Sequence, residues 1–310
     1  MRKTKLNLII TIFISLFVSG CSQENFLTRT KFFMGTIVEV TVPNQEAAKI
    51  VFDEFKALEE KLSHFNPNSE IAKLNTQGEI AADPQLVRLI KKSLEVSKAS
   101  SGAFDVSCAP LVDIWKKAIQ EKKEPNKLDI KKALSLVGWQ NIYLDKQSGI
   151  IKLKKGMKID LGAIAKGFAV DEAITKLKEA GVKSALINAG GNSYCLGTKA
   201  GRPWNIGLIN PRKTNEIIKT FSLSDKAIAT SGDYEQFFIS NNKRYSHIIN
   251  PHSGYPVENG ICSVTVVAQD ATTADALSTA IFVLGEEKGM KLAKEFKATD
   301  VKIIKGADCN

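Results

Sequence analysis

The sequence predicts an α+β fold, because apolar residues follow two different periods along the chain. Apolar residues three or four positions apart, the spacing of one helix face, recur in separate stretches. These stretches are residues 48–62, 87–94, 164–177 and 271–285. Alternating or wholly apolar runs, which are typical of strands, occupy residues 33–42, 184–188, 204–208, 227–234 and 264–268. Most of the strands lie in the second half of the chain, and there is no long-period repeat or low-complexity segment.

The N-terminal segment carries the marks of a bacterial secretory signal. Arg2, Lys3 and Lys5 precede an apolar run at residues 6–17, which is too short for a comfortable membrane span. Small residues then lead directly to Cys21, an order that matches the lipobox. We therefore expect export and a lipid anchor on Cys21, at the periplasmic face of the inner membrane or the outer face of the cell membrane. The plainer alternative is a signal peptide followed by an incidental cysteine.

This prediction divides the chain into a signal at residues 1–20, a membrane tether at residues 21–30 and a single domain at residues 31–310. The length would also accommodate two smaller domains, but 44% of the residues are hydrophobic, enough for one large core. Removing the signal lowers the net charge from +10 to +7. That charge suits an anionic ligand or membrane surface, although surface lysines alone could explain it. We expect no nucleic-acid partner.

Four cysteines remain in the mature chain, and their spacing argues against a zinc site or a dithiol redox motif. They are Cys108, Cys195, Cys262 and Cys309, far apart and without any CxxC pair. Three of them have apolar neighbours in the sequence, and we expect these three to be buried thiols. A disulfide remains open in an exported protein, and its pairing is not assigned.

In the first half of the chain, Met34-Gly35-Thr36 opens the first predicted strand. A glycine beside a methionine suits a strand start, and it would also let a flat ring lie on the backbone. The helix at 48–62 leads into a polar loop that contains His64 and Phe65, where His64 is more typical of a surface residue than of a ligand. Asp83-Pro84 is a cap and first-turn pair for the next helix.

A loop follows that helix, and it carries Gly102, Ala103, Phe104 and Asp105. The loop could present backbone groups and a carboxylate to the polar edge of a ligand. Its aromatic residue could equally fill the core, and the residues alone support both interpretations. A hairpin with strands at 142–144 and 150–153 is expected next.

Residues 159–171 turn from a strand into a helix, and they are the strongest candidate for a binding site. Asp160 is the predicted N-cap, Gly162 permits a tight turn, and Lys166 lies on the first helical turn. The unpaired N–H groups and partial positive charge of such a turn suit a phosphate. The plainer alternative is a capped helix with a solvated lysine. Gly181 is the predicted helix stop.

The last of these four helices brings a carboxylate and a hydroxyl onto one face. Asp275 and Thr279 are four residues apart. Both are hard oxygen donors, suited to a magnesium ion that keeps water or phosphate as its other ligands. Considered alone, the pair also fits a capping acid and a threonine bonded back to its own helix.

Taken together, these segments resemble the ApbE-type FAD:protein FMN transferases, formerly called thiamine biosynthesis lipoproteins. The resemblance extends from Met34 to Gly285, with every block in the family order. The blocks are Met-Gly-Thr at 34–36, Gly-Ala-Phe-Asp at 102–105, Asp-Leu-Gly-Ala-Ile-Ala-Lys-Gly at 160–167, Asn-Ala-Gly-Gly at 188–191, Thr-Ser-Gly-Asp-Tyr at 230–234, His-Ile-Ile-Asn-Pro at 247–251 and Ala-Asp-Ala-Leu at 274–277. The implied architecture is ApbE-like (T-fold-like), with mixed β-sheets packed against helices.

The resemblance implies a magnesium-dependent transfer of FMN from FAD to a threonine or serine hydroxyl of a partner redox protein, releasing AMP. By matching position, His247 is the base that activates the acceptor hydroxyl. The backbone carbonyl of Ala163 holds the metal together with Asp275 and Thr279. FAD contacts are implied for Met34, Phe65, Ala103, Phe104, Asp105, Asp160, Lys166 and Ile249.

Four positions depart from the family pattern. Asn192 and Asn250 stand where relatives often carry aspartate, and Phe65 stands where some carry tyrosine. Ser278 occupies a position at which some members have another acidic metal ligand, so magnesium could bind more weakly or with more water. None of these changes affects the implied base or the metal-binding pair.

Two alternative functions use the same residues. The first is an FAD pyrophosphatase that produces FMN and AMP, with water in place of the acceptor hydroxyl. The second is a flavin-binding lipoprotein without catalysis. The presence of His247 and of the Asp275/Thr279 pair argues against the second, because binding alone requires neither.

Overall fold

A seven-stranded sheet forms the centre of the fold in the computed structural model, which describes residues 25–213, 215–240 and 243–306. Every neighbouring pair of strands in this sheet is antiparallel. In spatial order the strands are β1 (Leu27–Phe33), β2 (Thr36–Val42), β6 (Ala185–Ala189), β7 (Asn192–Leu196), β10 (Lys226–Gly232), β13 (Ile261–Ala268) and β14 (Asp300–Lys305). The sheet therefore joins segments from both ends of the chain.

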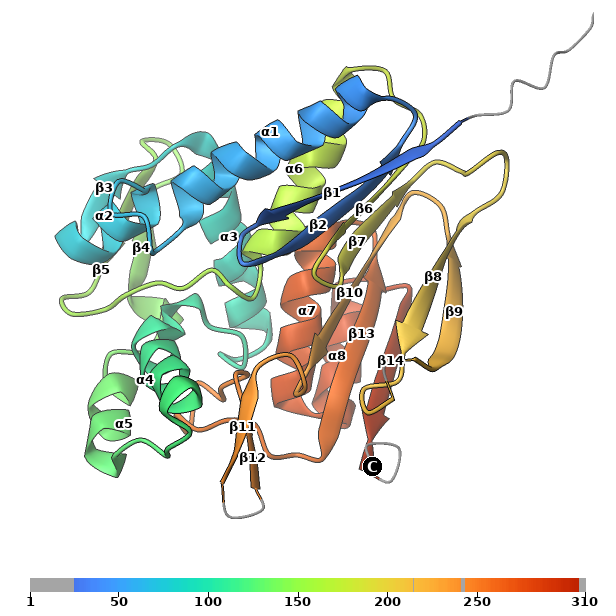
Figure 1. The fold of residues 1–310 in the computed structure, drawn as a ribbon. Helices are drawn as coiled ribbons and strands as arrows, with labels where there is room; N and C mark the ends of the chain where they lie inside the picture. Colours follow the sequence, from blue (N-terminus) through green and yellow to red (C-terminus); the bar gives the residue numbers. More distant parts are fainter. Residues whose placement is uncertain (1–24, 214, 241–242, 307–310) are drawn as a thin grey trace, which may run out of the picture.

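Helices cover one face of the sheet, and the main hydrophobic core lies between the two layers (Figure 1). These helices are α1 (Gln45–Leu62), α3 (Pro84–Ala99), α6 (Ala165–Glu179), α7 (Ala271–Leu284) and α8 (Glu286–Glu295). Strands β2, β6, β10 and β13 contribute alternate residues to this core. Such alternation is expected, because successive side chains of a strand point to opposite faces.

A hairpin of β8 (Trp204–Ile209) and β9 (Ile217–Leu223) packs on the other face of the sheet. Its Trp204 and Phe221 contact the side chains that β10 and β13 direct away from the helices, such as Ile228 and Val267. The indole N–H of Trp204 donates to the Leu196 carbonyl at 3.0 Å. The part of the sheet that contains β7 and β13 is thus buried on both sides.

A smaller cluster packs beside the main body, where α4 (Ala109–Glu121) and α5 (Lys127–Leu134) meet a two-stranded hairpin of β11 (Phe237–Ser240) and β12 (Lys243–Ser246) (Figure 1). Trp115 is its centre: the ring stacks on Tyr245 and its N–H donates to the Gly254 carbonyl at 2.8 Å. The remaining elements are α2 (Glu70–Gln77), the sheet β3 (Glu79–Ala81), β5 (Ile150–Leu153) and β4 (Ile142–Leu144), and the 3₁₀ turns η1 (Val106–Cys108) and η2 (Trp139–Asn141).

The α+β prediction is confirmed, and the predicted elements lie where the apolar periods placed them. The expected hairpin is formed by β4 and β5. Asp83 caps α3 by accepting a hydrogen bond from Gln85 N, and Gly181 follows the end of α6 with a φ of +79°. Among the described residues, none of the helices is both long enough and apolar enough to cross a bilayer. Cys21 lies outside the described residues.

Four expectations are wrong in detail. Residues 27–30, expected in the tether, belong to β1, and Met34 and Gly35 form a turn between β1 and β2, both with positive φ. Asp160 is not the N-cap of α6; that position is Ile164, which has no capping side chain. Cys108 and Cys195 are buried free thiols as expected, but Cys262 is disulfide-bonded.

Helices α6 and α7 touch at backbone distance, and each supplies a carboxylate to the other. Asp171 of α6 accepts hydrogen bonds from the N–H groups of Ala271 and Thr272, which open α7. In return, Asp275 of α7 accepts a hydrogen bond from Gly167 N in the first turn of α6 at 2.9 Å. A Cβ atom at Gly167 would lie 2.3 Å from the Ala271 carbonyl oxygen. Only glycine therefore permits this approach without a shift of one helix.

We expect Gly167→Ala to lower the free energy of unfolding by about 3 kcal/mol, because overpacking forces α6 and α7 apart. Chemical denaturation followed by circular dichroism measures the loss. Thr175→Ala, on the exposed side of α6, is the matched control and should change the stability by less than about 0.5 kcal/mol. A fully stable Gly167→Ala protein would show that the close approach of the two helices does not constrain the fold.

Candidate active site at the α6–α7 contact

The turn before α6 orients the polar groups of the 159–171 segment. The Asp160 carboxylate accepts a hydrogen bond from Gly162 N at 2.7 Å, so it closes the turn instead of capping the helix. The ammonium of Lys166 donates to the Gly162 carbonyl at 3.1 Å. No side chain caps α6, but three N–H groups of its first turn already have acceptors in the fold. Ala165 N donates to the Leu161 carbonyl, Gly167 N to the Asp275 carboxylate and Phe168 N to the Ile164 carbonyl. The features of this turn that suit a phosphate are therefore the positive charge of Lys166 and the helix dipole.

The Asp275 carboxylate is buried at the contact between α6 and α7, with only 4% of the residue exposed. Burial raises its pKa, while the nearby positive charge of Lys166 and the hydrogen bond from Gly167 oppose the rise. Thr279, one turn further along α7, has its hydroxyl 3.1 Å from that of Ser231 on β10. Ala163 lies in the turn that leads into α6. The α6–α7 packing thus places Asp275 beside the first turn of α6, which directly follows Ala163 in the chain.

These oxygen atoms fit magnesium in chemical type. The described parts of the chain contain no group of three or more His, Cys, Asp and Glu side chains that could hold a metal ion. Magnesium, however, usually binds through one or two carboxylates and completes its shell with water and substrate phosphates. One buried carboxylate beside a hydroxyl and a backbone carbonyl matches that requirement. Ser278 uses its hydroxyl on Ser231 and on the Asp275 carbonyl.

His247 follows β12, and its ring orientation is set by the neighbouring strand. Its Nδ1 lies 3.3 Å from the backbone carbonyl oxygen of Gln236. A carbonyl can only accept a hydrogen bond, so Nδ1 carries the proton and Nε2 keeps its lone pair. Burial and the positive charge of Lys166 lower the pKa of His247 to about 4. The imidazole is therefore neutral at pH 7, the form that can accept a proton.

Glu235 is a member of this group that the sequence analysis missed. Its carboxylate oxygen lies 3.9 Å from Nε2 of His247. Burial raises the pKa of Glu235, Lys166 lowers it, and Asp275 raises it further. These mutual effects mean that the four charged or titratable groups share one electrostatic environment. The only signal in the sequence was that Glu235 directly follows the block at 230–234.

Phe65 and Asp160, two of the implied FAD contacts, line a cavity of about 300 Å³. The Phe65 ring is 79% exposed and packs on the His64 ring at a centroid distance of 3.9 Å. Lys116 of α4 adds a positive charge, with its ammonium 3.4 Å from the Asp160 carboxylate and 5.6 Å from the centre of the Phe65 ring. Lys116 was also missed, because its partners lie far away in the sequence. An exposed ring beside a cation is well suited to stack on a planar, anionic ligand.

The side chains of the 102–105 loop are buried or bonded within the protein, so they are not available to a ligand. Ala103 and Phe104 are each 2% exposed. The Asp105 carboxylate accepts hydrogen bonds from Ser107 N, Ser107 Oγ and Trp139 N, all at 2.9 Å or less. A ligand would therefore meet the backbone of this loop, while the Asp105 side chain holds the loop in shape. Burial raises the pKa of Asp105 despite these donors.

Met34 and Ile249, the last two implied FAD contacts, belong to other parts of the structure. Met34, in the β1–β2 turn, donates its backbone N–H to a Glu59 carboxylate oxygen at 2.6 Å. Ile249 is buried in the cluster around Trp115. The structure does not describe a direct contact between either residue and Lys166, His247 or Asp275.

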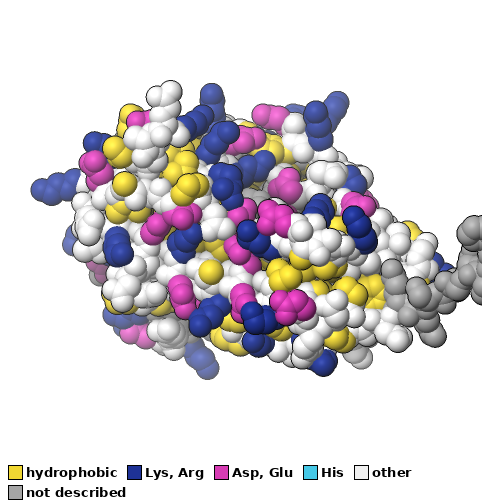
Figure 2. Space-filling model, turned by 90° about the horizontal axis from the view of Figure 1, so that it is seen from above, with side chains coloured by type: hydrophobic (Ala, Val, Ile, Leu, Met, Phe, Trp, Pro, Cys, Tyr) yellow, Lys and Arg dark blue, Asp and Glu magenta, His cyan; other side chains and the backbone are white. Residues whose placement is uncertain are grey.

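The net positive charge of the chain is not gathered into one large patch on the face seen in Figure 2, where Lys and Arg side chains alternate with Asp and Glu. The positive charge that matters for an anionic ligand is local. It consists of Lys166 beside His247 and Asp275, and of Lys116 beside Asp160. This arrangement can bind a phosphate-containing ligand and can remove a proton from a hydroxyl next to it.

Comparison with known proteins agrees with these observations. The sequence profile described as the ApbE family matches residues 34–303. The FAD:protein FMN transferase of Haemophilus influenzae is 34% identical over 243 residues, which cover 76% of this chain and 69% of that protein. The FAD:protein FMN transferase of Treponema pallidum is 32% identical over 313 residues, covering 92% and 86%.

Two crystal structures extend the similarity to the fold. The ApbE protein of Thermotoga maritima superposes with a TM-score of 0.83 at 34% identity, over 91% of this chain and 94% of that one. The apo form of the flavinyl transferase ApbE from Pseudomonas stutzeri gives a TM-score of 0.81 at 30% identity, over 92% of both chains.

We expect an NMR titration of the His247 ring to give a pKa of about 4 in the wild type. In Lys166→Met the pKa should rise, because the neighbouring ammonium no longer repels the imidazolium form. Lys178→Met, a lysine of the same helix that lies over Tyr194, is the control and should leave the midpoint unchanged. Equal midpoints in the wild type and Lys166→Met would show that Lys166 does not act on His247.

The same shift predicts a pH dependence of stability. The folded pKa lies below the value of about 6.5 that histidine has in an unfolded chain, so the unfolded state binds more protons between these values. The contribution of His247 to the free energy of unfolding therefore falls as the pH is lowered from about 6.5 towards about 4. His247→Gln should lose less stability than the wild type over that range, as measured by urea unfolding. Parallel losses in the two proteins would contradict the shift.

Proposed function

The chain belongs to the ApbE family, and we propose that it is an FAD:protein FMN transferase that modifies a threonine or serine hydroxyl of a partner redox protein. The family match spans residues 34–303, and relatives that carry this activity in their names cover most of the chain. The observation that supports the activity best is the grouping of Lys166, Asp275 and His247 around the α6–α7 contact. It combines charge for a diphosphate with a neutral base.

The transfer follows from the chemistry of these groups. The acceptor hydroxyl attacks the phosphorus atom of the FMN half of FAD, the phosphorus–oxygen bond to AMP breaks, and the hydroxyl proton passes to Nε2 of His247. Glu235 stabilises the resulting imidazolium through its carboxylate, which lies 3.9 Å from that nitrogen. The positive charge of Lys166 holds the negative charge of the diphosphate, and the positive end of the α6 dipole adds to it.

We propose that Ala163, Asp275 and Thr279 hold a magnesium ion during this reaction. Their oxygen atoms match the ligand preference of the ion, as described above. When bound, magnesium supplies positive charge to the diphosphate and thereby stabilises the leaving AMP. The burial of Asp275 supports this proposal, because a buried carboxylate with so few donors favours an additional cation.

We also propose that FAD binds in the cavity between Phe65 and Asp160 and extends towards Lys166. The loop at 103–105 and the residues Met34 and Ile249 complete the FAD contacts in this proposal. Export and a lipid anchor on Cys21 are proposed from the leader sequence. They would place the enzyme at a bacterial membrane, beside exported redox proteins.

Co-expression with candidate redox proteins tests the activity, with in-gel flavin fluorescence and mass spectrometry as readouts. We expect an acceptor to gain the mass of FMN on a threonine or serine. His247→Ala should lower the transfer rate about 100-fold or more, because the acceptor hydroxyl loses its base. His252→Ala, which changes an exposed histidine of the next turn, should retain transfer. Absence of labelling by the wild type, with AMP release that does not depend on His247, would overturn the proposal.

Replacing the Thr279 hydroxyl tests the metal site. We expect Thr279→Val to weaken magnesium binding by on the order of tenfold and to lower the transfer rate in parallel. Isothermal titration calorimetry measures the binding without reference to activity. Thr273→Val is the matched control, because the buried Thr273 hydroxyl in the same helix has no hydrogen-bond partner among the described residues. Equal magnesium affinity in Thr279→Val and Thr273→Val would exclude Thr279 as a ligand.

A further inference from the structure

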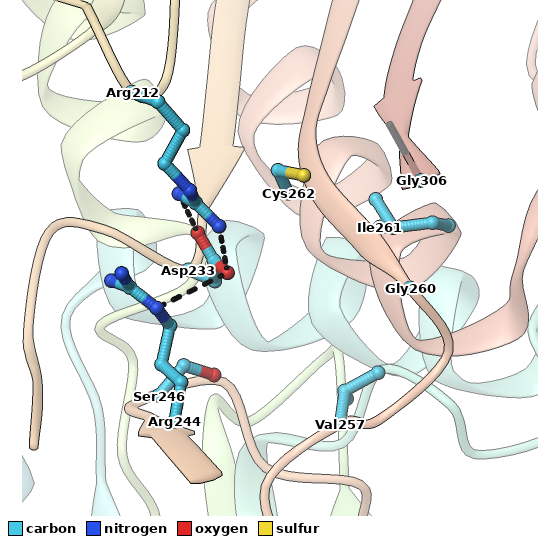
Figure 3. Close-up of a pocket in the computed structure, with 9 residues that line it drawn as sticks. All are labelled: Arg212, Asp233, Arg244, Ser246, Val257, Gly260, Ile261, Cys262 and Gly306. Carbon is cyan, nitrogen blue, oxygen red and sulfur yellow. Dashed lines mark hydrogen bonds and ion pairs between the residues drawn. The ribbon is translucent and has the colours of Figure 1, made fainter. Parts of the chain in front are cut away.

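A second cavity, of about 210 Å³, lies at the start of the segment that leads from β10 to His247 (Figure 3). Its charged lining residues are Arg212, Asp233 and Arg244, whose side chains converge in Figure 3. Cavities that hold a whole small ligand usually measure about 300–1,000 Å³. The size of this cavity therefore suits a single side chain better than a free cofactor.

The two arginines of this cavity share one carboxylate. Arg212 binds Asp233 with two parallel hydrogen bonds of 2.7 and 2.8 Å, which satisfy the acid. Arg244 is only an ion-pair neighbour, with its Nε 3.8 Å from the same carboxylate. The two guanidinium groups carry two positive charges and Asp233 carries one negative charge. The cavity therefore has an excess of one positive charge, which can bind an anionic group of a partner.

Arg244 keeps its hydrogen-bonding capacity. Its side chain is 29% exposed, and the guanidinium carbon lies 3.9 Å from the centre of the Phe237 ring. Among the residues that the structure describes, none accepts a hydrogen bond from this guanidinium. A guanidinium that lies over a ring and has unused N–H donors can bind a carboxylate with two parallel hydrogen bonds.

A buried hydroxyl faces the same cavity. Ser246 is 3% exposed, and its Oγ has no hydrogen-bond partner among the described residues. It lies two residues after Arg244 on β12, so both side chains occupy one face of the strand. A buried polar atom without a partner is unfavourable, and a bound acceptor group would satisfy it.

Exposed apolar side chains lie beside Arg244 and Ser246 on the same hairpin. Phe237 pairs with Ser246 and Ile239 pairs with Arg244 across the β11–β12 hairpin, so these four side chains share one face. Phe237 is 36% exposed and Ile239 is 59% exposed. Exposed apolar side chains beside a charged centre are typical of a surface that binds a polypeptide. His247 follows Ser246 directly, and the charge of Asp233, which lines the cavity, acts on the pKa of His247. The cavity therefore lies near the base.

We propose that this cavity binds an acidic side chain of the acceptor polypeptide, with Arg244 and Ser246 as its hydrogen-bond donors. The inference rests on the proposed function, since it supplies the acceptor with a docking point next to His247. An aspartate or glutamate would neutralise the excess charge and satisfy the Ser246 hydroxyl at the same time. A lysine or arginine of the acceptor would be repelled.

Steady-state kinetics with the acceptor protein found by the co-expression experiment tests this docking point. We expect Arg244→Gln to raise the KM for the acceptor about tenfold or more, with little change in the KM for FAD, because a partly buried charge pair is lost. Lys243→Gln is the matched control, because Lys243 lies on the same hairpin but pairs with Glu258 at 2.7 Å. Ser246→Ala should also raise the acceptor KM without lowering the unfolding midpoint, since it removes a hydroxyl that has no partner.

Acceptor variants complete the test. In the acceptor protein, each acidic residue near the labelled hydroxyl is changed to its amide. One of these acceptor variants should have a higher KM than the unchanged acceptor when the enzyme is wild type. With the Arg244→Gln enzyme, the same acceptor variant should cause no further increase in KM. The proposal is overturned if no such coupled residue exists, or if Lys243→Gln loses as much as Arg244→Gln. It is also overturned if acetate raises the unfolding midpoint through Arg244 while acceptor kinetics stay unchanged, because the site would then bind free carboxylates. A wild type that labels no protein would refute the proposed function itself.

Discussion

The exchange of carboxylates between α6 and α7 is the interaction on which the rest of the site depends. Asp171 of α6 accepts hydrogen bonds from the start of α7, and Asp275 of α7 accepts one from the start of α6. Gly167 permits this exchange because its missing side chain leaves room for the Ala271 carbonyl. The two helices come from segments about a hundred residues apart, yet they present Lys166 and Asp275 at one end of their contact. A shift of either helix would separate the Lys166 ammonium from the Asp275 carboxylate.

This contact buries two carboxylates, and the fold compensates them to different extents. Burial raises the pKa of Asp171 to about 6 and also raises that of Asp275. Asp171 has three donors from the N-terminus of α7, where the helix dipole also favours a carboxylate. Asp275 has one backbone donor and the field of Lys166. The first carboxylate is satisfied by the fold, whereas the second is left with a demand for positive charge, which is what a metal-binding and diphosphate-binding site requires.

Local patterns were sufficient to predict most helices and strands, and two errors show where they fail. Strand β1 was missed because its central residues are exposed on both faces, so no apolar period marks it. Asp160 was mistaken for a helix cap because a cap and a tight turn use the same local hydrogen bond. In both, an N–H two or three residues ahead donates to the carboxylate. The choice between the two depends on where α6 begins. That point is set by the packing of Ile164 and Phe168 in the core, which no short stretch of sequence contains.

The sequence by itself determined most of the elements and the family, because helical and strand periods and the order of the family blocks are local properties of the chain. The tertiary structure alone decided which groups meet. Glu235 lies beside His247, and Lys116 lies beside Asp160. The Asp105 carboxylate accepts hydrogen bonds that hold its own loop in shape. Arg212 and Arg244 both pair with Asp233. The physical reason is that such contacts join residues tens of positions apart. Their distances are fixed by how the sheet and helices pack, so they leave no periodic trace in the sequence.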